Sequence, residues 1–190
     1  MGAVERQTQK EHSKIEARHL ARYKIAKEHC INKSVLDIAS GCGYGTGLLA
    51  EVATSILGCD YSSEAIDYAR INWSSENITY KQVNIKDLPI LGQFDVVVSF
   101  ETIEHIDHEL IKTLEFYKSN LKQDGLLIFS HPENETDAKI NPFHHHFNIK
   151  KTIILPLLES IGFELVEYKE QEGYPGYYNY SIYILKLVNI

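Results

Sequence analysis

The chain has 190 residues, of which 44% are hydrophobic and 24% are charged, a composition typical of one ordinary globular domain. Its formal net charge of -7 would repel a phosphate backbone, which disfavours a nucleic-acid partner. No apolar run is long enough to cross a bilayer and the first residues lack a signal-peptide core, so we predict a cytoplasmic protein without a membrane partner. The cysteines Cys30, Cys42 and Cys59 have no metal or redox spacing and are predicted to be reduced packing residues.

Strand and helix patterns alternate along the chain, which predicts an α/β fold with a mostly parallel sheet covered by helices. The two last strands are joined by a short Gly/Pro turn and must pair antiparallel, so the sheet should end in a hairpin. We expect residues 1–33 to form a helical lid within the same domain as residues 34–190. The expected elements in chain order are helix 12–29, strand 34–40, a helix from residue 45, strand 55–61, helix 63–73, strands 78–85 and 94–100, helix 107–123, strand 126–132, helix 149–162 and strands 163–171 and 180–188.

The stretch VLDIASGCGYGTGLLA, residues 35–50, places a cluster of glycines between a predicted strand and a predicted helix. Glycines at such a turn let backbone N–H groups and the helix N-terminus approach a ligand closely. Gly41, Gly43 and Gly45 follow a GxGxG spacing, which is neither the dinucleotide fingerprint nor a P-loop. Asp60 ends the second strand, where a carboxylate can accept both ribose hydroxyls of a nucleoside-bearing cofactor. Together these features predict an adenosine-type ligand over the carboxyl ends of the strands.

Six stretches, taken in order, resemble the successive motifs of class I S-adenosylmethionine-dependent methyltransferases: VLDIASGCGYGTG, GCDYSSEAIDYAR, VNIKDLP, FDVVVSFETIEHI, LKQDGLLIFSHPEN and NPFHHHFNI. The similarity covers about residues 35–163 and is greatest to small single-domain enzymes that methylate sugars or other small hydroxylated metabolites. It implies a Rossmann-like, seven-stranded, mostly parallel sheet with helices on both faces and a C-terminal antiparallel hairpin. It also implies S-adenosylmethionine as cofactor, S-adenosylhomocysteine as product and a small-molecule acceptor as partner.

The resemblance further implies which residues hold the cofactor. Asp37 and Gly41 would line its methionine end, Asp60 would hold the ribose, and Tyr61 would pack on the adenine. Two positions depart from the family pattern: Ala39 stands where Gly is frequent, and Asn84 stands where an Asp commonly meets the adenine amino group, so that contact would lack charge assistance. Asp87 is an alternative adenine contact. The predicted cofactor set is Asp37, Ala39, Gly41, Gly43, Asp60, Tyr61, Asn84, Ile85 and Phe100.

The segment ETIEHI follows the fourth predicted strand and offers groups that could deprotonate an acceptor hydroxyl. Glu101 and His105 would share one face if the turn is helical, and imidazole is the side chain best suited to act as a base at neutral pH. We predict His105, Glu101 and His144 as catalytic residues, with His105 as the base. The alternative for His105 is a histidine that caps or packs the next helix, and for Glu104 a packing role is favoured.

Three consecutive histidines, His144, His145 and His146, occupy the predicted loop after the fifth strand. Loops at the carboxyl ends of strands line the ligand crevice, so at least one of the three is a candidate to face the acceptor. Consecutive side chains cannot all point the same way. We therefore expect two of the three to face solvent.

Glu101, Glu104, His105 and one loop histidine could alternatively hold a divalent metal. Such a site resembles that of small-RNA 3′-terminal 2′-O-methyltransferases, and its ExxEH part resembles metal-assisted quinone O-methyltransferases. The acidic chain suits RNA poorly, so the preferred prediction includes no metal. A metal-dependent RNA 2′-O-methyltransferase is the alternative function. A non-catalytic S-adenosylmethionine-binding regulator is a second alternative, which the intact GCGYG and ETIEH motifs disfavour.

The N-terminal helix carries Ile15, His19, Tyr23 and Ala26 at helical spacing. We expect this helix to lie across the cofactor and to contact the substrate through His19 or Tyr23.

Overall fold

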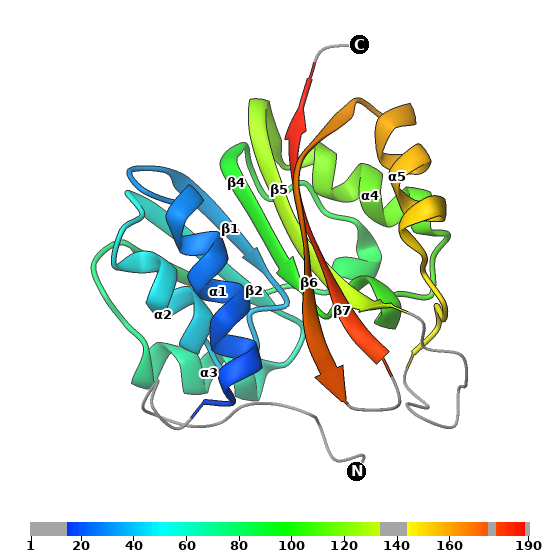
Figure 1. Ribbon diagram of the computed structural model, residues 1–190. Helices are drawn as coiled ribbons and strands as arrows, with labels where there is room; N and C mark the ends of the chain where they lie inside the picture. Colours follow the sequence, from blue (N-terminus) through cyan, green and yellow to red (C-terminus); the bar gives the residue numbers. More distant parts are fainter. Residues whose placement is uncertain (1–14, 134–143, 175–177, 189–190) are drawn as a thin grey trace. The chain divides into compact units, whose positions relative to one another are not determined.

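The computed structural model describes residues 15–133, 144–174 and 178–188. The chain divides into two compact units, Met1–Ile85 and Lys86–Ile190, and each is described by itself (Figure 1). Helix α1 (Ala17–His29) belongs to the first unit, and the predicted start of this helix at residue 12 lies outside the described residues.

Three parallel strands form the sheet of the first unit, in the order β3-β2-β1. They are β1 (Ser34–Ile38), β2 (Ser55–Asp60) and β3 (Ile78–Gln82). Helix α1 packs on α2 (Tyr44–Ala50), while α2 and α3 (Ser63–Asn72) pack on β2 and β3. Strand β1 is buried from its second residue onward, as expected of a parallel strand covered by helices, and this is why its sequence is nearly continuous in apolar residues.

Helix α3 begins where the sequence predicts it to begin. The Ser62 hydroxyl oxygen accepts the N–H of Ala65 at 3.2 Å, so one of the unsatisfied N–H groups of the first helical turn is bonded.

Four strands form the sheet of the second unit, in the order β4-β5-β7-β6. Strands β4 (Phe94–Phe100) and β5 (Leu121–Glu133) are parallel, whereas β7 (Tyr178–Leu187) runs antiparallel to both β5 and β6 (Phe163–Tyr174). The helical elements are η3 (Ile103–His105), α4 (Leu110–Ser119) and α5 (Lys151–Ser160), and η2 (Ile85–Asp87) spans the boundary of the two units. The predicted fold class is confirmed: the described residues form seven strands, mostly parallel, which are flanked by helices and end in an antiparallel hairpin. None of the described helices has the length and apolar character needed to span a membrane.

The predicted helix 107–123 is wrong at its C-terminal end. Helix α4 ends at Ser119 and strand β5 begins at Leu121, because the buried side chain of Asn120 stops the helix. Its Nδ2 donates to the Phe116 carbonyl oxygen at 2.9 Å, and its Oδ1 accepts the N–H of Leu91 at 2.7 Å. Asp124, the residue directly after the predicted helix 107–123, lies within β5 with φ 61°.

Ala39 follows β1 directly and has a φ of 56°. A residue with a Cβ loses about 1–2 kcal/mol in this left-handed region, and glycine does not. We expect Ala39→Gly to raise the free energy of unfolding by about 0.5–1 kcal/mol, because the added flexibility of the unfolded chain offsets part of the gain. Ala21→Gly, inside α1, is the matched control and should lower it by about 1 kcal/mol. Urea denaturation measures both changes, and a destabilised Ala39→Gly variant would contradict this account.

His131 is a buried histidine on β5, with its ring stacked on Tyr183 at a centroid distance of 5.5 Å. Burial lowers its pKa from 6.5 to about 4. The unfolded chain therefore binds more protons than the folded chain between these two values, and stability falls as the pH falls through that window, by roughly 3 kcal/mol for this group.

His131→Phe keeps an aromatic ring in the stack and removes the titration. Its free energy of unfolding should therefore fall less than that of the native chain as the pH is lowered from about 6.5 to about 4. Other titrating groups, among them His19 and Asp37, are present in both proteins, so the difference between the two pH profiles isolates His131. Parallel profiles would show that His131 does not titrate as described.

Candidate functional site

The loop between β1 and α2 holds two of the predicted glycines in the left-handed region. Gly41 has φ 55° and Gly43 has φ 86°. A Cβ on Gly41 would meet no atom of the described residues within 4 Å, so within this part of the chain the space beside it is open. A Cβ on Gly43 would lie 2.6 Å from the Cβ of Ala69 and 2.8 Å from the hydroxyl oxygen of Tyr80. Packing against α3 and β3 therefore requires glycine at position 43, whatever ligand the loop binds.

The third glycine, Gly45, allows α1 to pack closely on α2. A Cβ there would lie 2.1 Å from Cζ of Tyr23. Tyr23 is buried, its hydroxyl donates to Oδ1 of Asp37 at 3.1 Å, and its ring meets that of Tyr44 edge-on at 5.4 Å. The ring and hydroxyl of Tyr23 thus belong to the core of the first unit, and a contact between Tyr23 and substrate stays a prediction. His19 Nδ1 lies 3.3 Å from the Tyr44 hydroxyl oxygen.

Asp37 is a completely buried carboxyl group on β1. The Thr46 hydroxyl donates to its Oδ2 at 2.6 Å, and Tyr23 donates to its Oδ1. Burial raises the pKa of Asp37 to about 7, although both donors favour the ionised form and oppose the increase. The carboxyl group thus ties β1 to α1 and α2, and it fixes the ends of the glycine loop.

Asp60 ends β2 and is only 5% exposed. Its Oδ2 accepts the N–H of Gly41 at 3.0 Å, and its Oδ1 accepts the N–H of Ser62 at 3.0 Å. These bonds fix the carboxylate next to the open space at Gly41. Each carboxylate oxygen can accept more than one hydrogen bond, so an oriented group of this kind can also accept from the hydroxyls of a ligand.

The remaining predicted cofactor residues lie at or near strand ends. Tyr61 follows β2, and its side chain is 63% exposed, which leaves the aromatic ring accessible for stacking. Asn84 is exposed, whereas Ala39 and Ile85 are half-buried. Phe100 ends β4 of the second unit and is buried. The structure thus brings Gly41 and Asp60 together directly, and roles for the other residues stay predictions.

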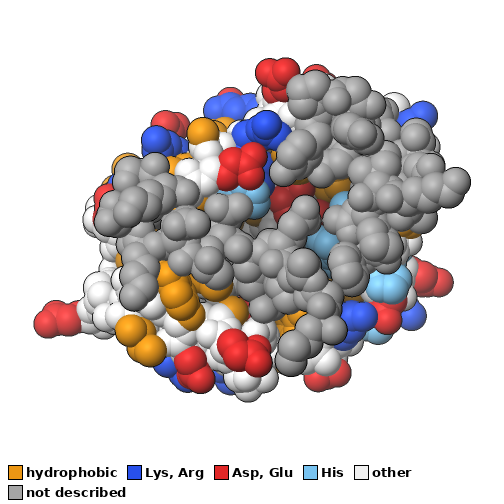
Figure 2. All heavy atoms as spheres, turned by 90° about the horizontal axis from the view of Figure 1, so that it is seen from below, with side chains coloured by type: hydrophobic (Ala, Val, Ile, Leu, Met, Phe, Trp, Pro, Cys, Tyr) orange, Lys and Arg blue, Asp and Glu red, His pale blue; other side chains and the backbone are white. Residues whose placement is uncertain are grey.

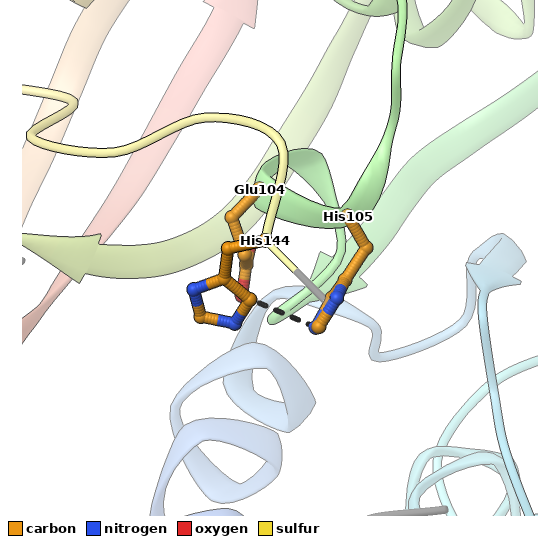
Figure 3. A group of neighbouring side chains, drawn as sticks. All are labelled: Glu104, His105 and His144. Atoms are coloured by element: carbon orange, nitrogen blue, oxygen red, sulfur yellow. Dashed lines mark ion pairs between the residues drawn. The ribbon is translucent and has the colours of Figure 1, made fainter. Parts of the chain in front are cut away.

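A second group of functional side chains lies within the second unit (Figure 3). Glu104 and His105 come from η3, and His144 comes from the segment after β5; one ligand atom from each lies within 4.8 Å of the other two. Nε2 of His105 is 4.0 Å from Oε1 of Glu104, and the two imidazole rings meet edge-on with centroids 4.5 Å apart. Glu104 is 1% exposed and His144 is 8% exposed, whereas the His105 side chain is 38% exposed. We call these three residues the Glu-His-His cluster.

The backbone holds the segment that carries His144 against η3. The N–H groups of His145 and His146 both donate to the carbonyl oxygen of Glu104, at 2.7 and 3.1 Å. Nε2 of His146 lies 2.7 Å from the carbonyl oxygen of His108 and donates to it when that nitrogen carries the proton. Of the three consecutive histidines, His144 is thus in the cluster, His145 is exposed and His146 is half-buried. We expected two of the three histidines to face solvent, but only His145 is exposed.

Glu101 is not part of the Glu-His-His cluster, although the sequence favoured it over Glu104. Its Oε1 accepts the hydroxyl of Ser130 at 2.6 Å, and its backbone has φ 51°. Helix η3 starts only at Ile103, so the turn does not continue as a helix from Glu101 to His105. The carboxylate in the cluster is Glu104, for which the sequence favoured a packing role. That it directly precedes His105 in the sequence was the one feature that could have indicated a functional role.

Comparison with known proteins places the chain in a family. A family model described as "Methyltransferase domain" matches residues 31–168. A protein of Mycolicibacterium smegmatis named as a probable S-adenosylmethionine-dependent methyltransferase is 30% identical over 154 residues, which are 78% of this chain and 58% of that protein. A ubiquinone biosynthesis O-methyltransferase of Actinobacillus pleuropneumoniae is 32% identical over 107 residues, 52% of this chain and 45% of that protein. The chain spans about half the length of the curated relatives it matches.

Solved structures share the fold. The N-methyltransferase NodS of Bradyrhizobium japonicum, crystallised with S-adenosyl-L-homocysteine, has a TM-score of 0.73 at 19% identity and covers 90% of this chain and 86% of its own. The 1,6-didemethyltoxoflavin-N1-methyltransferase of Burkholderia thailandensis has a TM-score of 0.75 at 17% identity, over 92% of this chain and 80% of its own. The matched residues 31–168 contain the glycine loop, Asp60 and the Glu-His-His cluster. The chain belongs to the methyltransferase-domain family, within the class I S-adenosylmethionine-dependent methyltransferases.

Proposed function

We propose that this chain transfers the methyl group of S-adenosylmethionine to a hydroxyl oxygen of a small molecule, such as a sugar or another hydroxylated metabolite. The observation that carries the proposal is the Asp60 carboxylate, which the N–H groups of Gly41 and Ser62 hold beside open space. A carboxylate in this position at the end of a parallel strand suits a ribose diol. Family membership supports the same cofactor.

The proposed contacts follow from the exposure and chemistry of each side chain. Asp60 accepts from the ribose hydroxyls, Tyr61 stacks on the adenine, and the Asn84 amide oxygen accepts from the adenine amino group. Asp37 acts indirectly, because its carboxyl group is already bonded to Tyr23 and Thr46. The proposed set is completed by Ala39, Gly41, Gly43, Ile85 and Phe100.

Methyl transfer to a hydroxyl breaks the S–CH3 bond, forms an O–CH3 bond and releases the hydroxyl proton. The sulfonium is already electrophilic, so the protein has to align the reactants, exclude water and accept the proton. Without a metal ion, the imidazole of His105 takes this proton, since it is the more exposed ring of the Glu-His-His cluster. His144 lies against the ring of His105, and Glu104 stabilises the imidazolium that forms.

Glu101 keeps a proposed catalytic role, as an oriented carboxylate at the end of β4 that Ser130 holds in place. Its left-handed backbone is costly for a residue with a Cβ, and such strain often accompanies functional positions.

A metal-dependent RNA 2′-O-methyltransferase is a second candidate, favoured by the close approach of Glu104, His105 and His144. The net charge of -7 opposes it. On the face drawn in Figure 2, the described Lys and Arg side chains are scattered among Asp and Glu. RNA binding would show a steep loss of affinity with added salt, and binding of a small acceptor would not. A regulator that binds the cofactor without turnover is the remaining alternative, and a methyl-transfer assay separates it from both enzymes.

The cofactor site is tested by substitution of Asp60. We expect Asp60→Asn, which keeps the shape and loses the charge, to weaken S-adenosylmethionine binding at least about 30-fold, since a lost charged hydrogen bond costs about 2–3 kcal/mol. Asp67→Ala, an exposed aspartate on α3, is the matched control and should leave the Kd unchanged. Calorimetry measures the Kd, with circular dichroism as a check on the fold. Native affinity in Asp60→Asn would overturn the assigned cofactor site.

The role of the Glu-His-His cluster is tested with His105→Ala. Removing the proposed base should lower turnover at least about 100-fold and leave the Kd for S-adenosylmethionine unchanged. His145→Ala changes an exposed histidine of the same segment and should keep native turnover. The assay follows formation of S-adenosylhomocysteine with sugars, sugar nucleotides, phenols and short RNAs as acceptors. Native turnover in His105→Ala, with an acceptor that the native chain methylates, would return His105 to a packing role.

A further inference from the structure

The Glu-His-His cluster combines the side chains that divalent transition metals prefer. Two imidazoles and one carboxylate form the protein part of several catalytic zinc sites, which keep the fourth position open for water or substrate. We propose that Glu104, His105 and His144 bind one divalent metal ion of this class, with Zn²⁺ the best match to the donors. The proposed function does not require such an ion, so the inference goes beyond it.

The distances leave room for an ion between the three side chains. Because the ligand atoms lie within 4.8 Å of one another, a single point lies no more than about 2.8 Å from all three, and Zn²⁺ binds nitrogen and oxygen at about 2.0–2.2 Å. A shift of less than about 1 Å by each atom would therefore complete the coordination. The half-exposed side chain of His105 is the least restricted of the three, since Glu104 and His144 are buried.

The separation within the cluster differs from that of an ordinary Glu–His hydrogen bond. Such a bond brings nitrogen and oxygen to about 3 Å, whereas Nε2 of His105 and Oε1 of Glu104 are 4.0 Å apart. The three ligand atoms nevertheless all lie within 4.8 Å of one another. Figure 3 shows the side chains of Glu104, His105 and His144 gathered together, with the ion pair between Glu104 and His105 drawn as a dashed line.

The backbone preorganises the three side chains. The Glu104 carbonyl oxygen accepts from the N–H groups of both residues that follow His144, so the segment that brings the third side chain is fastened to the turn that brings the first two. The conformational entropy of these residues is lost when the chain folds. Ligand binding therefore does not bear the cost of ordering them.

The proposed ligand set differs from one based on the ETIEH motif alone. Glu101 hydrogen-bonds to Ser130 and lies outside the cluster, which leaves three protein ligands and open coordination positions. A bound ion of this kind lowers the pKa of a coordinated hydroxyl group. If the proposed function is correct, His105 is then a ligand, and the acceptor proton leaves to water.

The test measures metal binding alone, with no cofactor or acceptor present. The full chain, without a histidine tag and stripped with a chelator, is titrated with Zn²⁺, and Co²⁺ is added separately to report coordination through its visible absorption. We expect one equivalent of Zn²⁺ per chain. Glu104→Gln and His105→Ala should each weaken binding at least about 100-fold, because each removes a ligand. His105→Ala changes a half-exposed residue, so it tests the site even if the buried Glu104→Gln variant does not fold.

His145→Ala is the matched control, since it removes the adjacent, exposed imidazole and should leave the Zn²⁺ affinity unchanged. Absence of saturable binding at one equivalent would overturn the metal site. So would an equal loss of affinity in His145→Ala and His105→Ala, which would indicate adventitious binding to surface histidines. S-adenosylmethionine binding, measured on the same stripped protein, separates failure of the metal site from failure of the proposed function.

Discussion

The first unit depends on keeping two buried carboxyl groups, Asp37 and Asp60, at adjacent parallel strands. Removing a carboxylate from water costs several kcal/mol unless hydrogen bonds replace the lost hydration. Hydroxyls of Tyr23 and Thr46 supply them for Asp37, and backbone N–H groups of Gly41 and Ser62 supply them for Asp60. The same bonds that make burial tolerable therefore also fix the glycine loop. Stability and the shape of the proposed ligand site have a common origin here.

In the second unit, a single carbonyl oxygen fixes the backbone next to the proposed site. The Glu104 carbonyl accepts from two successive N–H groups, which joins the end of the segment after β5 to the turn after β4. Loops usually run over the surface and satisfy their backbone groups with water. His145 and His146 are instead tied to η3 next to the Glu-His-His cluster, so main-chain hydrogen bonds hold the position of the adjacent His144.

The fold could be predicted from the sequence because periodic apolar patterns and turn residues directly reflect burial. Strand β4 has the bounds that the sequence predicts, and the hairpin follows from a short turn. The end of α4 could not be predicted, because it depends on where the buried Asn120 side chain finds its partners. Gly43 and Gly45 were attributed to ligand approach, yet each is required by a tyrosine distant in sequence, Tyr80 or Tyr23. Choosing between Glu101 and Glu104 needed the direction of the chain after β4, which spacing alone does not give.

That direction is set by a left-handed residue placed directly after a strand, and each unit contains such a residue. Ala39 directly follows β1 and Glu101 directly follows β4, and both have left-handed φ values, 56° and 51°. A backbone hydrogen bond to the neighbouring strand lies at each turn. The N–H of Ser40, the residue after Ala39, donates to the Cys59 carbonyl oxygen, and the N–H of Glu101 itself donates to the Ser130 carbonyl oxygen. A residue with a Cβ loses stability in this conformation, so both turns are retained against a local cost. Each turn leads the chain away from its strand within a few residues, to Gly41 in one unit and to Glu104 and His105 in the other. Gly41 in the first unit, and Glu104 and His105 in the second, thus follow a strained turn, which links the backbone strain to part of the proposed chemistry.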